Sequence, residues 1–239
     1  MVIRLDKYLC DMQAGTRSAV KDIIRKKKVT INGEVITRPE TKVDTDKDVV
    51  TVDNNVLGYS EYEYYMLNKP AGVVSAVSDK NFKTVGELIT DKKRKALFPV
   101  GRLDKDTVGL LLITNDGNLA HRLLSPKHHV DKCYFAKVQG NVTKDDAEKF
   151  AEGVNIGTED EPEITMPGKL DIIKSDDLSE IRLTIQEGKF HQVKRMFQAV
   201  GKEVVYLKRE RMGSLILDDN LAEGEYRMLT EEELKNLLF

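Results

Sequence analysis

The sequence predicts an α+β protein with two domains, a small one at residues 1–58 and a larger one at residues 61–239. Two observations predict this division. The first segment is basic and combines helical apolar spacing with a hairpin signal, whereas the second is rich in short strand patterns between helices. The chain has 239 residues, which at about 150 residues per domain allows a small and a medium domain.

Composition excludes several classes of protein. With 40% hydrophobic and 33% charged residues the chain is globular and rich in surface charge. No apolar stretch approaches the roughly 18 residues of a membrane span, and charges at Arg4, Asp6 and Lys7 interrupt any signal peptide. We therefore expect a cytoplasmic protein with no membrane partner. Cys10 and Cys133 lie far apart, so neither a disulfide framework nor a zinc site is indicated.

The net charge of −2 hides a strong asymmetry along the chain. Residues 1–43 hold ten Lys and Arg against five Asp and Glu, an excess of five positive charges. Residues 187–211 hold seven Lys and Arg against three acids. A solvated helix face is the usual explanation of such a run. One basic patch in each domain is nevertheless what a large nucleic-acid ligand would need, because phosphate contacts dominate its affinity.

Short helices and a hairpin are expected in the small domain. Apolar residues between Leu5 and Met12 recur at helical spacing, Gly15 ends this pattern, and Thr16 is expected to cap a second helix. The buried face of that helix is expected to be Val20, Ile23 and Ile24.

The hairpin is indicated by Asn32-Gly33 between β-forming apolar residues. Residues 41–53 predict a closing strand, and residues 54–60 a short linker. Two short helices, a basic helix end and a hairpin resemble the S4 RNA-binding domain, whose pattern is followed by RLDKYLCDMQAGTRSAVKDIIRKKKVTINGEVI. The resemblance implies binding of structured RNA. The residues that it implies face RNA phosphates are Arg4, Arg17, Ser18, Arg25, Lys26, Lys27 and Lys28.

In the larger domain the most informative stretch is FPVGRLDKDTVGLLLITNDG, at residues 98–117. The apolar run at residues 110–114 is bounded by turn residues and predicts a strand covered on both faces. Asp104 then lies on a loop that leads into a core strand, where a carboxylate is held rigidly enough for chemistry. The alternative is an aspartate that caps a turn.

Other strands and helices are expected along the rest of this domain. Strands are predicted at residues 62–68, 132–138, 181–185, 204–207 and 214–217. Helices are predicted at residues 85–89, 118–124, 143–150 and 191–200, and after a capping box formed by Thr230 and Glu233.

Cofactor and metal sites lack support in the sequence. The chain has neither of the Gly-rich phosphate-binding motifs, so no nucleotide cofactor is expected. The adjacent His128 and His129 would point to opposite faces of a strand, which suits a shared metal poorly. Cys133 has no recognisable base partner and is expected to be a small buried hydrophobe.

Three segments in a fixed order resemble the active-site motifs of RNA pseudouridine synthases. These segments are GRLDKDTVGLLLITNDG, KCYFAKV and EGKFHQVKRMF. The whole chain resembles the RsuA branch of this family, which acts on small-subunit (16S) ribosomal RNA. The resemblance implies a domain built on a mixed, mainly antiparallel sheet with flanking helices. It also implies a monomer without cofactor or metal that isomerises a uridine, uridine-516, in 16S rRNA or a small-subunit assembly intermediate.

The resemblance gives a role to each matched residue. Asp104 is the nucleophile, attacking either C6 of uracil or C1′ of the ribose, and a nearby cation would lower its pKa. Lys194 matches the family's basic residue. Many relatives have Arg there and Lys lacks the bidentate fork, so Arg195 is a second candidate for this role. Tyr134 would stack on uracil and help to remove the C5 proton, the alternative being an aromatic of the core.

Further contacts to the substrate are implied. Arg102 would fill the hole left by the flipped nucleotide or grip its phosphate, and extrusion of a base from a duplex costs a few kcal/mol. Leu207 would form an apolar floor beneath the base. Gln192 is the remaining substrate-binding residue implied by the resemblance.

Three competing functions stay open from the sequence. The target could be a uridine of large-subunit rRNA. The protein could also be an inactive S4-domain factor in ribosome assembly, although Asp104, Tyr134 and Lys194 are all present. A DNA-binding protein has least support, because the chain has no helix-turn-helix signature.

Overall fold

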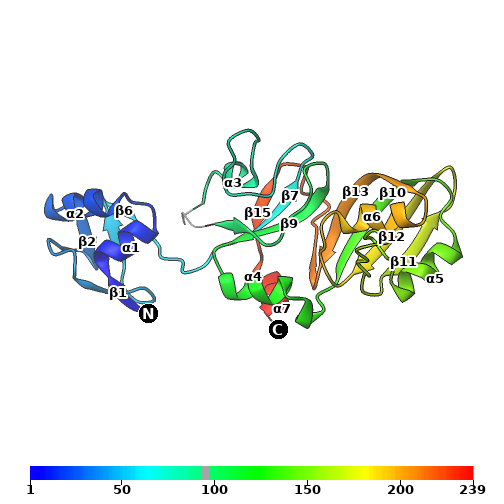
Figure 1. Ribbon diagram of the computed structural model, residues 1–239. Helices are drawn as coiled ribbons and strands as arrows, with labels where there is room; N and C mark the ends of the chain where they lie inside the picture. Colours follow the sequence, from blue (N-terminus) through cyan, green and yellow to red (C-terminus); the bar gives the residue numbers. More distant parts are fainter. Residues whose placement is uncertain (93–96, 239) are drawn as a thin grey trace. The chain divides into compact units, whose positions relative to one another are not determined.

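The computed structural model describes residues 1–92 and 97–238, and these residues form two compact units (Figure 1). Unit 1 contains Met1–Glu63 and residues 90–92 and 97. Unit 2 contains Tyr64–Ile89 and residues 98–238. Residues 93–96 and 239, which fall within the predicted larger domain, lie outside the described residues.

Two helices build the core of unit 1, as predicted. Helix α1 (Leu5–Asp11) buries Leu5, Tyr8 and Leu9. Helix α2 (Arg17–Arg25) begins after Thr16, whose hydroxyl accepts a hydrogen bond from the Ala19 amide at 3.3 Å. These helices pack their apolar sides on one core with strand residues of the same unit.

The hairpin of unit 1 joins β2 (Val29–Ile31) to β3 (Glu34–Val35). Asn32 and Gly33 both have positive φ, at 53° and 86°, as the tight two-residue hairpin turn requires. The other strands of this unit are β1 (Val2–Arg4), β4 (Lys42–Asp44), β5 (Val50–Val52) and β6 (Asn55–Val56).

Two sequence expectations about the end of unit 1 are wrong. Residues 41–53 form two strands rather than one, since β4 pairs with β1 and β5 pairs with β2. The expected linker begins with a strand, β6, which pairs with β5 after a turn in which Asp53 and Asn54 have positive φ. Leu57 and Tyr59 also pack on the core of unit 1. In the sequence Asn54, Asn55, Gly58 and Ser60 interrupt the apolar residues of this segment, which hides the short pairing.

The described residues of unit 2 form one nine-stranded sheet, whose main path runs β11-β12-β10-β13-β9-β7-β15. The pair β9–β13 is parallel and the other pairs are antiparallel, so the sheet is mixed and mainly antiparallel as predicted. The strands are β7 (Tyr64–Lys69), β8 (Phe98–Pro99), β9 (Val108–Thr114), β10 (Lys132–Gln139), β11 (Lys169–Lys174), β12 (Leu178–Ile185), β13 (Glu203–Met212), β14 (Leu215–Ile216) and β15 (Tyr226–Met228). Strands β8, β11 and β15 were not predicted.

Helices flank the sheet, and polar caps set where several of them begin. The helices are α3 (Val85–Leu88), α4 (Gly117–Leu124), the 3₁₀ turn η1 (Pro126–His128), α5 (Lys144–Glu152), α6 (Gln192–Ala199) and α7 (Glu231–Leu238). Asp116 accepts hydrogen bonds from the first amides of α4, and Thr143 with Asp146 forms a capping box at α5. The predicted box at α7 is confirmed, since Glu233 accepts from the Thr230 amide at 2.8 Å.

The parallel pair β9–β13 joins the two halves of this sheet. Gly109 lies opposite Arg209 of β13, and Arg209 lies opposite Tyr134 of β10. Gly109 has φ of 99°, and a Cβ atom at this position would lie 2.4 Å from the Arg209 carbonyl oxygen. A glycine is therefore required where the loop that carries Asp104 enters β9 against β13.

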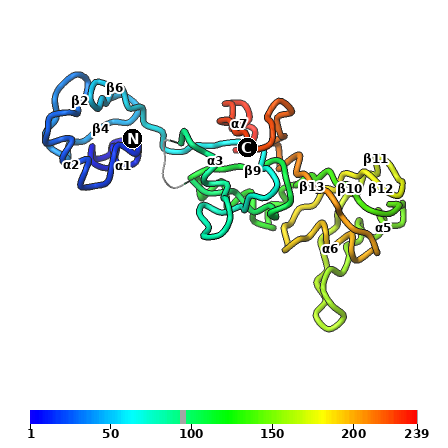
Figure 2. Tube along the Cα trace, turned by 90° about the horizontal axis from the view of Figure 1, so that it is seen from above, coloured from blue at the N-terminus to red at the C-terminus, as the bar shows by residue number. Residues whose placement is uncertain are grey.

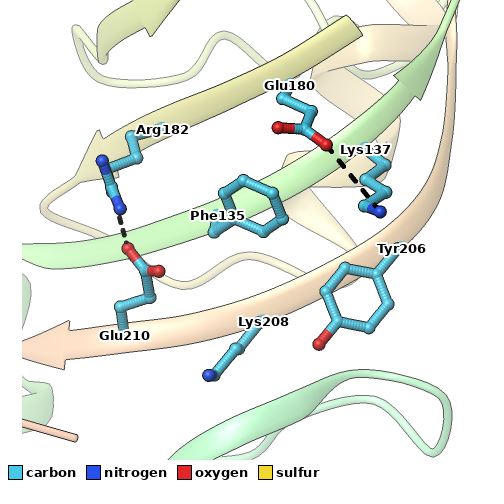
Figure 3. A pocket seen from close by; sticks show the side chains of 7 residues that line it. All are labelled: Phe135, Lys137, Glu180, Arg182, Tyr206, Lys208 and Glu210. Atoms are coloured by element: carbon cyan, nitrogen blue, oxygen red, sulfur yellow. Dashed lines mark hydrogen bonds and ion pairs between the residues drawn. The ribbon is translucent and has the colours of Figure 1, made fainter. Parts of the chain in front are cut away.

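The two faces of β12, β10 and β13 differ. Alternate residues of β10, including Tyr134 and Ala136, are buried on the face where α5 and α6 lie (Figures 1 and 2). The opposite face is open in the described residues and holds Phe135 and Tyr206, with ring centroids 6.2 Å apart (Figure 3). Its ion pairs are Lys137–Glu180 and Arg182–Glu210. Strand alternation thus puts Tyr134 and Phe135 on opposite sides.

Candidate active site

Asp104 lies on the loop between β8 and β9, and hydrogen bonds fix the loop's backbone around it. The Thr107 amide donates to the Asp104 carbonyl at 3.1 Å. Ser75 binds both polar groups of the neighbouring Leu103 backbone, at 2.8 and 3.0 Å. The Asp104 side chain remains 26% exposed, so a substrate can reach a carboxylate whose position is set by its backbone.

Beneath this loop lies Lys69, whose side chain is completely buried. Its ammonium group donates to the carbonyls of Pro70 at 3.0 Å, Lys105 at 3.3 Å and Thr107 at 2.8 Å. Burial lowers the pKa of Lys69 to about 8, although the negative charges of Asp106 and Asp104 oppose this shift. Lys69 therefore holds both sides of the turn that follows Asp104.

Helix α6 brings two basic side chains to Asp104. Lys194 Nζ lies 3.4 Å from Asp104 Oδ2, and His191 Nε2 lies 3.5 Å from Asp104 Oδ1. His191 is the residue that precedes α6 and has left-handed backbone angles. The carboxylate thus contacts a side chain from the residue that precedes α6 and one from the first turn of α6.

Asp106 shares the ammonium group of Lys194. Lys194 Nζ lies 2.6 and 2.8 Å from the two Asp106 oxygens, closer than to Asp104. The hydrogen bond from Lys194 lowers the pKa of Asp106. The Asp106 side chain is 73% exposed, so water screens this pair more than the pair with Asp104.

A cavity beside Asp104 gathers most of the predicted substrate contacts. Its lining includes Arg102, Asp104, Tyr134, Gln192 and Leu207. Tyr134 and Leu207 are 8% and 6% exposed and provide apolar walls, whereas Arg102 is exposed at the edge. The sequence therefore identified residues from four separate segments that the fold brings to one place.

Thr107 also lines this cavity, and its hydroxyl group is buried. The hydroxyl oxygen has no hydrogen-bond partner among the residues that the structure describes. A buried polar atom without a partner is costly and calls for an explanation. Thr107 therefore brings a buried hydroxyl without a partner to the wall of the cavity.

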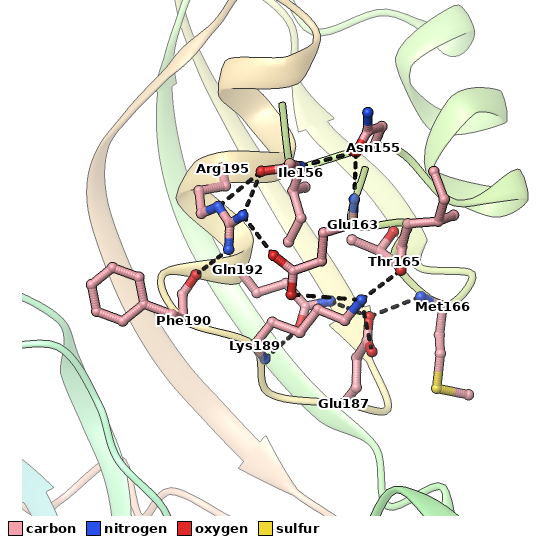
Figure 4. A network of polar contacts seen from close by, with 12 residues as sticks. Asn155, Ile156, Glu163, Thr165, Met166, Glu187, Lys189, Phe190, Gln192 and Arg195 are labelled. Carbon is pink, nitrogen blue, oxygen red and sulfur yellow. Dashed lines mark hydrogen bonds and ion pairs between the residues drawn. The ribbon is translucent and has the colours of Figure 1, made fainter. Parts of the chain in front are cut away.

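The prediction that Arg195 shares the place of Lys194 beside Asp104 is not met. The Arg195 guanidinium donates to the Ile156 carbonyl at 3.0 and 2.5 Å, to the Phe190 carbonyl at 3.1 Å and to Glu163 at 2.6 Å (Figure 4). Arg195 lies next to Lys194 on α6 and points away from Asp104 because successive helix residues are about 100° apart. Its contacts join α6 to the loop between α5 and β11.

Gln192 and Glu187 continue this polar network. Gln192, 4% exposed, donates to Glu187 at 2.8 Å and accepts from the Lys189 amide at 2.9 Å. Glu187 also accepts from the Met166 amide at 2.8 Å. Gln192 thus both lines the cavity and holds the backbone that precedes α6.

The predicted RNA-binding residues of unit 1 are all exposed. Three of them have acidic partners: Arg4 with Asp6, Arg25 with Asp22, and Lys28 with Asp53. No ion pair is formed by the other three cations within residues 1–92 and 97–238. These are Arg17, Lys26 and Lys27, at the two ends of α2.

Four site residues were missed by the sequence interpretation: Lys69, Asp106, Thr107 and His191. Asp106 and Thr107 belong to the motif that was quoted for Asp104, and His191 to the motif that was quoted for Lys194. Membership of these motifs is the sequence signal by which the three residues could have been identified. Lys69 lies in a separate strand, and its burial under the loop depends on the β7–β9 pairing.

None of the helices in the described residues combines the length and the apolar composition of a membrane span. Nor do three or more His, Cys, Asp or Glu side chains come together there as they would around a metal ion. His128 and His129 lie in and just after the 3₁₀ turn η1 rather than on a strand.

Comparison with known proteins shows the family of this chain. A family model described as RNA pseudouridylate synthase matches residues 63–199, and the S4 domain model matches residues 3–50. A crystal structure of a pseudouridylate synthase is 40% identical, with a TM-score of 0.67, and covers 98% of this chain and 99% of its own. The chain therefore belongs to the RNA pseudouridine synthases and carries an S4 domain.

Two curated relatives refine this class. An Escherichia coli (strain K12) protein, ribosomal small subunit pseudouridine synthase A, is 41% identical over 99% of this chain and 100% of its own length. A Bacillus subtilis (strain 168) protein, the uncharacterized RNA pseudouridine synthase YtzG, is 47% identical over 97% of each chain. The chain is accordingly an RNA pseudouridine synthase of the RsuA type.

Lys69 gives a pH-dependent stability that can be measured. Its pKa is about 8 in the folded protein against an ordinary value of 10.5, so the unfolded chain binds more protons between these values. The free energy of unfolding of wild type relative to Lys69→Met should therefore rise as the pH increases from 8 to 10.5. Urea unfolding of both proteins at several pH values measures this difference. A difference that is flat or falls with pH would contradict the assignment.

Proposed function

We propose that this protein converts one uridine of 16S ribosomal RNA, uridine-516, to pseudouridine, with Asp104 as nucleophile and without a cofactor. The observation that carries the proposal is the carboxylate of Asp104, which lies between Lys194 and His191 at a cavity lined by Tyr134 and Leu207. The names of full-length relatives support a small-subunit RNA target. The substrate is the RNA itself or a small-subunit assembly intermediate, and the protein acts as a monomer.

The chemistry requires Asp104 to be ionised when the base arrives. Lys194 Nζ and His191 Nε2 lie 3.4 and 3.5 Å from the Asp104 oxygens, and the exposed part of the carboxylate can approach the substrate. Attack at C1′ would form a bond from Asp104 to C1′ and expel uracil with the electron pair of the C1′–N1 bond, whereas attack at C6 would form a bond from Asp104 to C6 before the C1′–N1 bond breaks. Uracil then turns, C5 bonds to C1′, and the bond to Asp104 breaks to restore the carboxylate. C5 loses its proton and N1 gains one, and the Tyr134 hydroxyl would help to remove the C5 proton directly or through water.

The cavity walls keep the detached base close to C1′. Tyr134 provides an aromatic face and Leu207 an apolar floor, so uracil can rotate without diffusing away. Arg102, exposed at the edge, would occupy the place of the flipped nucleotide or bind its phosphate. The S4 domain would add affinity by binding backbone phosphates of the folded RNA.

Asp104→Asn tests the nucleophile, with Asp106→Asn as the matched control. Both changes remove one carboxylate that contacts Lys194, but only Asp104 lines the cavity. Asp104→Asn should lose at least about 10⁴-fold in rate, on the scale seen when a nucleophile is removed. Asp106→Asn should stay within about tenfold of wild type. The assay is single-turnover pseudouridine formation in a 16S rRNA transcript. Near-normal turnover by Asp104→Asn would remove Asp104 from this role.

Thr107→Val tests whether substrate completes the hydrogen bonding of the buried hydroxyl. Valine has nearly the same shape and removes an unpartnered polar atom, so the melting temperature should be unchanged or higher. The value of kcat/KM should fall about tenfold, as expected for one lost hydrogen bond of about 1.4 kcal/mol. A variant that melts earlier while kcat/KM is unchanged would show that the hydroxyl serves the fold alone.

Substitution of Lys26 and Lys27 tests whether the S4 domain binds RNA phosphates through these two side chains. In the double variant Lys26→Ala/Lys27→Ala the affinity for 16S rRNA should fall, and the slope of log K against log salt should decrease by about 1.5. The control is Lys169→Ala/Lys174→Ala on β11, where each lysine is exposed and has an aspartate partner. Filter binding at several salt concentrations measures both. Equal slopes in the two variants would exclude Lys26 and Lys27 as phosphate contacts.

A further inference from the structure

Phe190, just before α6, exposes 74% of its surface although it is a large apolar residue. Its ring stacks on His191, with ring centroids 3.8 Å apart and an interplanar angle of 19°. His191 in turn lines the cavity that contains Asp104 and lies 3.5 Å from its carboxylate. An exposed aromatic ring therefore lies one side chain away from the proposed nucleophile.

The backbone under this ring is held firmly. The Phe190 carbonyl accepts a hydrogen bond from Arg195, and Figure 4 shows the ring pointing away from the polar network. The Lys189 amide donates to Gln192, and the Arg195 amide donates to the His191 carbonyl at 2.9 Å. His191 itself has φ of 48°, a conformation that a non-glycine residue keeps only when its surroundings impose it.

Such rigidity makes Phe190 a ready surface for binding. A flexible exposed ring would lose entropy when it docks, whereas this ring already has a fixed backbone and a stacked neighbour. Three cations, Arg102, Lys189 and Lys194, lie at or beside the same cavity. Lys189 also pairs with Glu163 and Glu187, and Lys194 with Asp104 and Asp106, so cations and carboxylates alternate around the exposed Arg102. A flat apolar face and an exposed cation at the cavity are complementary to a nucleobase joined to phosphates, because bases stack and the backbone is anionic.

We propose that Phe190, supported by His191, is a stacking platform for the base next to the target uridine in the RNA. This inference rests on the proposed function, which places a flipped uridine at Asp104. Removing uridine from a helix unstacks its neighbour, and a ring at the mouth of the cavity would replace the lost stacking partner. Stacking is tolerant of base identity, so Phe190 would stabilise the opened RNA rather than select its sequence.

Fluorescence offers a direct test, because the chain contains no tryptophan. Phe190→Trp in the full-length Asp104→Asn protein gives a single reporter at the proposed platform and prevents turnover. A 16S rRNA stem-loop should quench its emission by half or more at saturation, whereas a base-free polyphosphate should not. The control Ile173→Trp, at a side chain 49% exposed on β11, should change little with either probe. Equal quenching by polyphosphate, or none by RNA, would overturn the proposal.

The affinity of Phe190 variants for the stem-loop provides a second test. Phe190→Ala should raise Kd for the stem-loop about tenfold, which is within the range measured for one base stacked on an aromatic ring. Phe190→Tyr should bind like wild type. Phe190→Leu should bind like Phe190→Ala, because it keeps the apolar volume and loses the flat face. Wild-type affinity in Phe190→Leu would overturn the proposal in favour of a general apolar contact.

An RNA without one base identifies the stacked partner. Stem-loops are made with an abasic residue on the 5′ or on the 3′ side of the target uridine. With one of them the tenfold effect of Phe190→Ala should disappear, since there is no base to stack. Persistence of the full effect with both abasic RNAs would overturn the proposal. These readouts concern binding, so they stay interpretable if Asp104→Asn proves active and the proposed nucleophile fails.

Discussion

The ammonium group of Lys194 contacts two carboxylates of the same loop, those of Asp104 and Asp106. The geometry of the site depends on which of the two lies closer to this group. Its contact with Asp106 is shorter, at 2.6 Å, than its contact with Asp104, at 3.4 Å. The Asp106 pair is largely in water, where an ion pair contributes at most about 1 kcal/mol. Lys194 can therefore move toward Asp104 at little cost. If the proposed RNA substrate displaces water from the partly buried Asp104, the attraction between Asp104 and Lys194 becomes stronger.

This geometry is possible because two distant parts of the chain meet at a single parallel strand pair. Asp104 lies on the loop before β9, and Lys194 lies on the helix that precedes β13. Gly109 lets β9 approach the backbone of Arg209, and Arg209 also lies opposite Tyr134. Asp104, Lys194 and Tyr134 are therefore positioned by the register of three adjacent strands, while Lys69 donates hydrogen bonds to the loop that follows Asp104.

Local signals in the sequence were sufficient for much of the fold. Thr16 and Thr230 cap helices through contacts within three residues, and Asn32-Gly33 closes a hairpin, so neighbouring residues determine these features. The short pairing at Asn55–Val56 was missed because it depends on β5, not on its own composition. The motif placed Asp104 on a loop that leads into a core strand, as the structure shows. The contact of Lys194 with Asp106 joins segments that are distant in the sequence, so no local pattern predicts it.

Lys194 and Arg195 are adjacent on α6, and the shape of each side chain explains why Lys194 contacts Asp104 whereas Arg195 does not. Arg195 satisfies two carbonyl oxygens and a carboxylate at once, which suits a planar fork with several fixed donors. Lys194 faces two carboxylates that differ in exposure, which suits a compact charge on a flexible stem. If the two were exchanged, a lysine could not make all the contacts that hold Phe190 and the loop at Ile156. Two adjacent cations of α6 therefore make different contacts, Lys194 with the carboxylates of the Asp104 loop and Arg195 with the loop at Ile156.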